Sequence, residues 1–354
     1  MFFVPIASKH QKPVSAKANP SGIVLRLSLV ACLAIGNPAA AQEIATDTPG
    51  DVVQALAEPA GVAAELIAPC EADDAEACTA LGYRLLEGDG VPKDEARAAG
   101  VFAQACQFGS MRGCTMAGYA YAEGQGVTAA PERAASYYAF ACHGGEGTAC
   151  SNLGLAYMNG FGVPRDPVRA TALFREACDK GGSGGCANLG ASYSLGGRGV
   201  PRDQRQAARL FRQACDDDNQ HACYNLGVLY RDGLGVSRDY KRAIALFEQS
   251  CAAQDGSACG NLGLMVDDGR GTAPDRQRSL ALFDKACGLG EAESCFSLGR
   301  AYQTGNGRER DDARAIVLLE RTLSLDPETP SAAGAAKALE MARAAIAAPE
   351  KAAP

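Results

Sequence analysis

The cysteines are the residues whose number and spacing could support chemistry in this sequence. Of the 15 cysteines, all except Cys32 fall into seven pairs, and the second member of each pair is the eighth residue after the first. The pairs are Cys70 with Cys78, Cys106 with Cys114, Cys142 with Cys150, Cys178 with Cys186, Cys215 with Cys223, Cys251 with Cys259 and Cys287 with Cys295. Thiols arranged in pairs can form disulfides, bind a metal ion or take part in redox reactions.

Metal binding does not suit this pattern. A zinc site needs a cluster such as C-x-x-C with further Cys or His ligands, and the sequence contains no C-x-x-C. His143 and His221 lie within the paired region but at different places in their loops. We therefore predict structural disulfides, with no metal ion and no other cofactor.

Two pairings of the cysteines would preserve the repeat. One joins the two members of each pair, such as Cys70 and Cys78. The other joins the second member of one pair to the first member of the next, as Cys78 to Cys106, and leaves Cys70 and Cys295 unpaired. Because only the first uses all fourteen cysteines, parity favours the shorter pairing.

The pairs recur with a period that indicates the fold. The seven units start at residues 70, 106, 142, 178, 215, 251 and 287. Successive starts are separated by the same number of residues, with one exception. The step from 178 to 215 is one residue longer, because the turn within Gly196–Gly199 contains an extra glycine. This period is typical of stacked helix-turn-helix units.

The second cysteine of each unit is predicted to lie on a first helix, helix A. Leu-Gly follows in six units, namely Leu81-Gly82, Leu153-Gly154, Leu189-Gly190, Leu226-Gly227, Leu262-Gly263 and Leu298-Gly299. Cys, Leu and a later Tyr share one helical face, and Gly lets a neighbouring helix approach closely. A G-x-G turn, such as Gly160 and Gly162, should end the helix in a positive-φ conformation.

An aspartate is predicted to cap the second helix, helix B, in six units. A carboxylate at this position accepts hydrogen bonds from free amides at the positive end of the helix. The caps are Asp94, Asp166, Asp203, Asp239, Asp275 and Asp311. The second unit has Ala130-Pro131 instead. The first cysteine of the next unit should then lie near the end of helix B.

Residues 1–41 resemble an export signal. Lys9, Lys12, Lys17 and Arg26 precede an apolar run, Leu27–Ile35, and Ala39-Ala40-Ala41 follows before Gln42. This order predicts a secretory signal peptide cleaved after Ala41, and the run is too short to span a bilayer. The acid-free segment is also compatible with an organelle presequence. Leu29-Val30-Ala31-Cys32 resembles a lipoprotein box, which gives a third interpretation.

The composition fits a helical protein with a core of small residues. Hydrophobic residues make up 47% of the chain and aromatic residues only 6%, with 41 glycines and no tryptophan. The formal charge of −7 argues against a nucleic-acid-binding protein, which needs a basic face. Fifteen cysteines favour an oxidising compartment, so we expect a periplasmic or secreted protein without stable membrane insertion.

The motif L-G-x-x-Y-x-x-G-x-G-V, with D-x-x-x-A and L-F downstream, resembles the Sel1-like repeat, a relative of the tetratricopeptide repeat. Leu153–Val163 and Leu226–Val236 are clear examples. With a Cys pair in every unit, the chain is most similar to the cysteine-rich Hcp-type subclass. The resemblance implies an all-α fold, a right-handed superhelical solenoid of seven disulfide-braced repeats over residues 70–322.

This resemblance also implies a non-enzymatic scaffold or adaptor that binds a protein or extended peptide on the concave face of the solenoid. We expect a monomer. Two alternatives are open. Some cysteine-rich relatives have been labelled β-lactam-binding or β-lactam-hydrolysing proteins, although S-x-x-K, S-D-N and K-T-G motifs are absent here. A cell-envelope assembly factor is the other alternative.

Two sets of polar residues are candidates for contacting the partner. Asparagine precedes Leu-Gly in four consecutive units, at Asn152, Asn188, Asn225 and Asn261. These amides could bond an extended peptide or a neighbouring repeat. An acidic residue comes just before the turn at Glu87, Glu123, Asp232 and Asp268. Acids disfavour a helix C-terminus, so they could form either an edge that attracts a basic partner or a merely solvated edge.

Both ends of the repeat array should be covered by further helices. Residues 42–69 form a linker and an N-terminal capping helix in this interpretation, with Val52–Ala68 interrupted by Pro59. Residues 323–354 contain a closing helix, Ser331–Ala348, followed by a disordered tail. Leu339, Met341 and Ile346 are expected to cover the last hydrophobic face.

Overall fold

The computed structural model describes residues 64–197, 200–328 and 330–347, and every named secondary-structure element in these ranges is a helix. The predicted signal segment, residues 1–41, lies outside them, as do residues 42–63 of the predicted linker and cap. The chain divides into two compact units, Met1–Arg202 and Asp203–Pro354. The division falls in the turn of the fourth repeat, next to the extra glycine, where Gly197 and Val200 form an isolated bridge.

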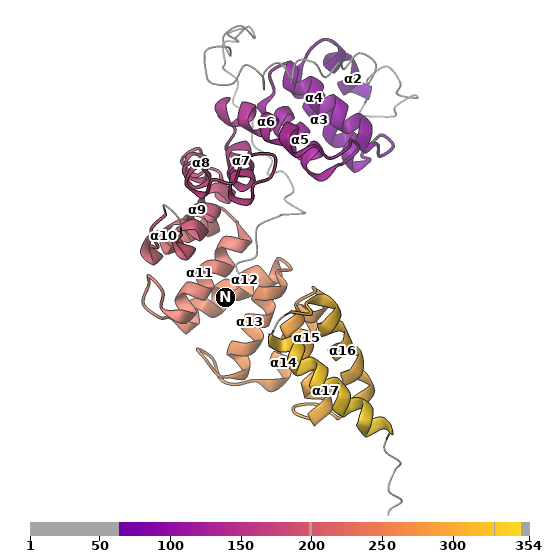
Figure 1. The fold of residues 1–354 in the computed structure, drawn as a ribbon, viewed down its shortest axis with the longest axis vertical. Coiled ribbons are helices and arrows are strands. Elements are labelled where there is room, and N and C mark those ends of the chain that lie inside the picture. The colour runs from indigo at the N-terminus through magenta and orange to yellow at the C-terminus, as the bar shows by residue number, and fades with distance from the viewer. Residues whose placement is uncertain (1–63, 198–199, 329, 348–354) are drawn as a thin grey trace, which may run out of the picture. The chain divides into compact units, whose positions relative to one another are not determined.

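Each unit is a succession of helical hairpins (Figure 1). Unit 1 contains α2 (Ala64–Glu71), α3 (Ala75–Glu87), α4 (Glu95–Gln107), α5 (Met111–Glu123), α6 (Pro131–His143), α7 (Gly147–Asn159), α8 (Pro167–Asp179) and α9 (Ser183–Leu195). Unit 2 contains α10 (Gln204–Asp216), α11 (Gln220–Asp232), α12 (Tyr240–Ala252), α13 (Gly256–Asp267), α14 (Arg276–Gly288), α15 (Ala292–Thr304), α16 (Asp312–Leu325) and α17 (Pro330–Ala347). The predicted all-α repeat fold is confirmed.

The predicted aspartate caps mark the N-terminus of helix B. All six aspartates accept backbone N–H groups from the first turn of the helix that follows. Asp166, for example, accepts from Val168 at 3.1 Å and from Arg169 at 3.0 Å. The exception also behaves as expected, because Ala130 gives no side-chain cap and Pro131 occupies the start of α6.

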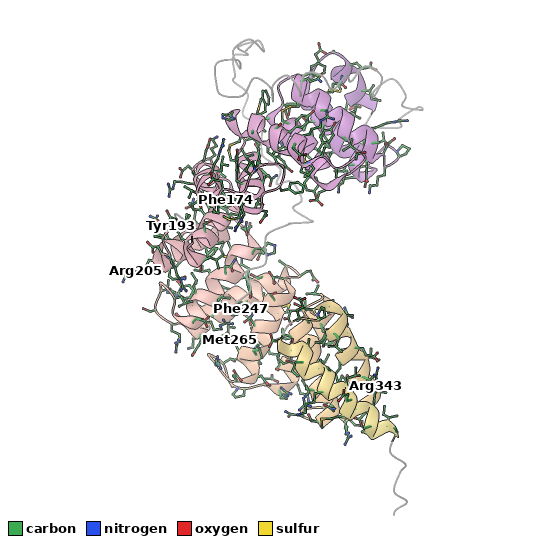
Figure 2. The ribbon with its side chains drawn as sticks, in the orientation of Figure 1. Phe174, Tyr193, Arg205, Phe247, Met265 and Arg343 are labelled. Carbon is green, nitrogen blue, oxygen red and sulfur yellow. A yellow bond between two sulfur atoms is a disulfide. The ribbon has the colours of Figure 1, made fainter. Side chains whose placement is uncertain are left out.

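Helices A and B pack closely because a glycine of one faces a ring of the other. A Cβ added at Gly154 of α7 would lie only 2.5 Å from a ring carbon of Phe174 of α8. In unit 2, Gly227 of α11 faces Phe247 of α12 in the same way, at 2.8 Å. Both rings, labelled in Figure 2, are at most 2% exposed. The glycine of Leu-Gly thus creates the space that the phenylalanine fills.

The last helix, α17, covers the end of unit 2 with a narrower stripe of buried apolar residues than predicted. Ala335, Ala338, Leu339 and Ala342 are buried, whereas Met341 is 55% exposed and Ile346 is 56% exposed. The prediction was therefore right for Leu339 and wrong for the other two. Met341 falls beside the stripe of three- and four-residue spacings, and Ile346 lies in the final turn, beyond it.

Candidate partner-binding surface

Every repeat holds one disulfide between the last turn of a helix and the first turns of the next. All seven bonds join cysteines that are 8 residues apart, with Cα–Cα distances of 4.5 to 4.7 Å. They join Cys70 with Cys78, Cys106 with Cys114, Cys142 with Cys150, Cys178 with Cys186, Cys215 with Cys223, Cys251 with Cys259 and Cys287 with Cys295. The structure thus has the shorter of the two possible pairings.

The sulfurs are enclosed by the repeats. All fourteen cysteine side chains are at most 6% exposed. Cys142, Cys150 and Glu176 lie close together, but both sulfurs are committed to a disulfide and offer no thiolate to a metal ion. The cysteines therefore act here as structural links between successive helices.

At two of these disulfides, a lysine from the following repeat contacts the end of helix B. Lys180 Nζ donates to the carbonyl oxygen of Cys142 at 2.9 Å and lies 3.7 Å from Cys150 Sγ. Lys285 Nζ donates to the carbonyl oxygen of Cys251 at 2.7 Å. The carbonyls at a helix C-terminus carry partial negative charge and lack helical partners. The two ammonium groups therefore stabilise the ends of the helices that the disulfides join.

The four asparagines lie at the same position on helix A but have different surroundings. Asn188 is 8% exposed, and its amide donates to Ser151 Oγ of the preceding repeat at 3.1 Å. Asn261 donates to Tyr224 Oη at 3.4 Å and accepts from Arg231. These two side chains therefore bond a neighbouring repeat.

The other two asparagines have amides that bond no neighbouring repeat. The Asn225 side chain donates to the carbonyl oxygen of His221 in its own helix, at 3.0 Å. Asn152 is half-buried and forms no hydrogen bond with another side chain in the described part of the chain. These amides retain polar atoms that a bound segment could use.

The four acidic residues also separate into two groups. Asp232 pairs with Arg231 at 2.7 Å, and Asp268 pairs with Arg270 at 2.9 Å. Glu87 and Glu123 are exposed and form no ion pair with a described residue. The prediction of an acidic edge that attracts a basic partner therefore depends on Glu87 and Glu123.

The structure also contains a set of tyrosine–arginine pairs that was not predicted from the sequence. In four repeats, the tyrosine near the end of helix A lies against an arginine in the first turn of helix B. The centroid-to-guanidinium distances are 4.4 Å for Tyr121 with Arg133, 4.4 Å for Tyr157 with Arg169, 5.5 Å for Tyr230 with Arg242 and 5.6 Å for Tyr302 with Arg314. Such distances allow cation–π attraction. The constant separation of the two residue types in the sequence was the available signal.

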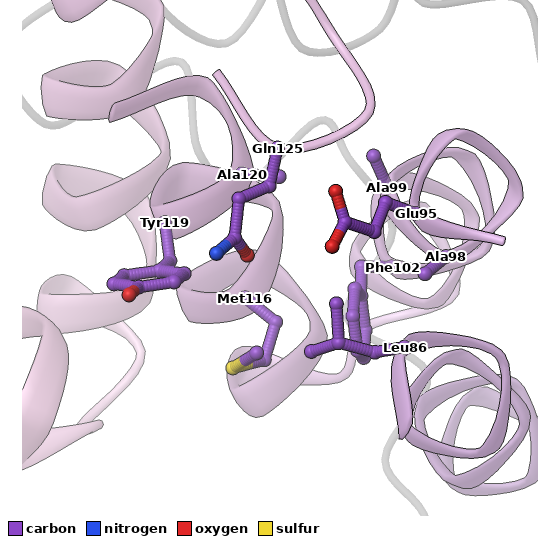
Figure 3. A pocket seen from close by; sticks show the side chains of 9 residues that line it. All are labelled: Leu86, Glu95, Ala98, Ala99, Phe102, Met116, Tyr119, Ala120 and Gln125. Atoms are coloured by element: carbon purple, nitrogen blue, oxygen red, sulfur yellow. The ribbon is translucent and has the colours of Figure 1, made fainter. Parts of the chain in front are cut away.

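A small cavity lies between the first two repeats and illustrates the packing of unit 1 (Figure 3). Leu86, Phe102, Met116 and Tyr119 contribute to its lining, and its volume is about 10 Å³. A space of this size admits about one water molecule. It cannot hold a metabolite.

The Sel1 repeat model matches seven segments of the chain, at residues 75–107, 112–146, 147–182, 183–219, 220–255, 256–291 and 292–326. The chain belongs to the Sel1-repeat family. Each matched segment of this Sel1-repeat protein runs from helix A through helix B, and a disulfide such as Cys106–Cys114 joins the end of one segment to the start of the next. The prediction of a cysteine-rich Sel1-repeat protein with a disulfide for each repeat is thereby confirmed. A comparison with curated proteins gave no match.

Solved structures with the same fold include two bacterial proteins. A protective antigen of uropathogenic Escherichia coli with an SLR fold is 22% identical, with a TM-score of 0.61 over 88% of this chain and 68% of that one. A Sel1 repeat protein from Oxalobacter formigenes is 24% identical, with a TM-score of 0.62 over 69% of this chain and 96% of that one. The cysteine-rich protein B of Helicobacter pylori is 28% identical, with a TM-score of 0.31 over 38% of this chain and 98% of that one.

These findings establish a repeat solenoid of a kind that commonly mediates protein–protein interaction, in a family that is generally non-enzymatic. A disulfide in every repeat indicates an oxidising environment outside the cytoplasm. Within the described ranges, none of the helices has the length and apolar character needed to cross a membrane.

Proposed function

We propose that the protein is an exported, non-enzymatic scaffold that binds a protein or extended peptide segment along helix A of its repeats. In this proposal residues 1–41 are removed after Ala41, and the mature chain acts as a periplasmic or secreted monomer. The binding face is the concave surface of the solenoid.

One observation carries this proposal: asparagine occupies one position of helix A in four successive hairpins, and the amides of Asn152 and Asn225 bond no described residue of a neighbouring repeat. Asn152 and Asn188 occupy one position in adjacent repeats of unit 1, and Asn225 and Asn261 occupy it in adjacent repeats of unit 2. Periodic donors and acceptors suit a partner whose own backbone amides recur along an extended chain. A compact metabolite would use only one such position.

Binding and stability should be separable among the asparagines. The N152A/N225A variant should lose partner binding and keep its melting temperature, because neither amide bonds a neighbouring repeat. The matched variant N188A should lose about 1 kcal/mol or more of unfolding free energy, the cost of leaving a buried polar group without its partner. The group left behind is the hydroxyl of Ser151, which is buried and accepts from the Asn188 amide.

The experiment is affinity capture by the oxidised protein from a cell-envelope extract at low and high salt, followed by mass spectrometry. Thermal unfolding of each variant provides the stability measurement. The proposal predicts a reproducible partner that N152A/N225A fails to retain at unchanged melting temperature. Equal retention by N152A/N225A and the wild type would contradict a role for these amides, and the absence of any specific partner would contradict the scaffold function.

A further inference from the structure

A basic depression on unit 2 is not accounted for by the asparagine positions. We call it the arginine pocket. Its lining includes Arg212 of α10, Tyr230 of α11, and Arg238, Asp239 and Arg242 around the start of α12, and its volume is about 420 Å³. It thus joins helix B of the fourth repeat to both helices of the fifth.

The Tyr230 hydroxyl lies at this pocket and donates its hydrogen to no described residue. Tyr230 is only 6% exposed, and its oxygen accepts from Arg212 Nη2 at 2.8 Å and from Arg242 Nη1 at 3.1 Å. A phenol oxygen that accepts two hydrogen bonds still has one O–H to donate. No described residue accepts this proton, so the hydroxyl is a donor that lacks an acceptor.

The charges around the hydroxyl are also unbalanced. Arg212 and Arg238 form no ion pair with a described residue, and Arg242 Nε lies 3.3 Å from Asp239 Oδ2. The other carboxylate oxygen of Asp239 caps α12 by accepting the backbone N–H of Arg242 at 3.0 Å. Three guanidinium groups thus face a single carboxylate, in a chain whose formal net charge is −7.

The tyrosine itself responds to this positive charge. Partial burial raises the pKa of the Tyr230 phenol, but the hydrogen bonds from Arg242 and Arg212 outweigh the burial and leave the pKa below its ordinary value of 10.0. Positive charge therefore favours the deprotonated phenol here. The same charge would favour an anion placed beside it.

Two arginines donate to Tyr230, whereas Tyr193 of the preceding repeat accepts from one described arginine, Arg175, which also lies 18 residues before it, at 2.7 Å. Tyr302, two repeats after Tyr230, accepts from Arg314 at 3.1 Å. The residue that would correspond to Arg212, 18 positions before the tyrosine, is Asp284 in that repeat. An acid replaces a base there, so a second guanidinium cannot come from that position.

We propose that the arginine pocket binds a carboxylate of an acidic segment in the protein partner, an inference that rests on the scaffold function proposed above. Guanidinium groups match a carboxylate with paired N–H donors, and the Tyr230 O–H supplies a further donor at the same place. A phosphate oxygen shares this chemistry. A protein carboxylate is the ligand that the scaffold function supplies.

The test measures the Kd of a fluorescent hexaglutamate peptide for the oxidised protein, its R212Q variant and the matched control R209Q. Arg209 is exposed on the same helix α10 and bonds Gln206 outside the pocket, so both variants remove one charge from one helix. R212Q should weaken binding about tenfold or more, as expected for a charge-assisted contact. R209Q should change the Kd less than about twofold.

Two further measurements test whether the Tyr230 hydroxyl donates to the ligand and whether the ligand is a carboxylate. Y230F keeps the ring but removes the hydroxyl, so it should also weaken hexaglutamate binding, and inorganic phosphate should compete only weakly. Equal weakening by R212Q and R209Q would overturn the pocket in favour of general charge attraction. Phosphate binding that depends on Arg212, without hexaglutamate binding, would overturn the carboxylate assignment.

The captured partner separates this inference from the scaffold function. If R212Q retains the partner as well as the wild type does, the pocket assignment is overturned and the scaffold function stands. If the wild type retains no partner, the scaffold function fails, and the pocket's role in holding a partner fails with it. Loss of a captured partner by R212Q, but not by R209Q, supports both.

Discussion

Complete reduction of the seven disulfides should unfold the protein at room temperature. Each bond closes a loop of only a few residues, which in the chain-entropy model contributes about 2.5 kcal/mol by restricting the unfolded chain. Domains of ordinary stability unfold with about 5–15 kcal/mol, so seven such losses exceed the usual total. Far-UV circular dichroism after reduction in urea and return to reducing buffer measures the result. Native helicity and an unchanged melting temperature in the reduced chain would contradict this prediction.

A single pair provides the control for general effects of the reductant. The C215A/C223A variant lacks the bond between Cys215 and Cys223, which joins α10 to α11. It should lose about 2.5 kcal/mol of unfolding free energy in oxidising buffer, as measured by urea unfolding beside the wild type. In fully reducing buffer the wild type and the variant should both be unfolded, with the same far-UV circular dichroism. A variant that loses much less than about 1 kcal/mol in oxidising buffer would show that this bond contributes little to stability.

Replacing Gly162 with alanine should destabilise unit 1 by about 3 kcal/mol, the sum of a conformational cost and a packing cost. Gly162 has φ +68°, and a Cβ there would overlap the carbonyl group of Pro131, at the start of helix B of the preceding repeat. The left-handed backbone costs about 1–2 kcal/mol for a residue with a Cβ. Overlap with backbone adds about 1–3 kcal/mol, because backbone cannot rotate away.

Gly160→Ala is the matched control in the same turn. Gly160 has φ +75°, but an added Cβ would have its nearest neighbour, Arg165 Cβ, at 3.3 Å. This variant should lose only the conformational part, about 1–2 kcal/mol. Urea unfolding of both variants gives the difference. Equal losses would show that the contact between this turn and the preceding helix B contributes nothing.

Much of the fold is predictable because local chemistry repeats. Asp166 caps α8 by accepting nearby backbone amides, an interaction that sequence position alone defines. Gly154 faces Phe174 at the same offset at which Gly227 faces Phe247, so one repeat predicts another. The closing helix α17 has no counterpart among the repeats, and its hydrophobicity did not reveal which residues face α15 and α16. The prediction that Met341 and Ile346 are buried is wrong for that reason.

The candidate surface was less predictable than the fold. The sequence placed four asparagines at one position, but it could not show that Asn188 reaches Ser151 while Asn225 bonds its own helix. Such differences depend on neighbouring side chains in space. The two hydrogen bonds to the Tyr230 hydroxyl were hidden for the same reason, since the two arginines come from different repeats and approach it only after folding.

Every proposal above requires a chain that has left the cytoplasm with its cysteines joined in pairs. The most direct test is mass spectrometry of the protein recovered from the cell envelope or culture medium, alkylated before any reduction. The account predicts an N-terminus at Gln42 and seven bridged peptides, each joining cysteines 8 residues apart, with no alkylated cysteine among the fourteen. Alkylated cysteines throughout a chain that still carries residues 1–41 would contradict it.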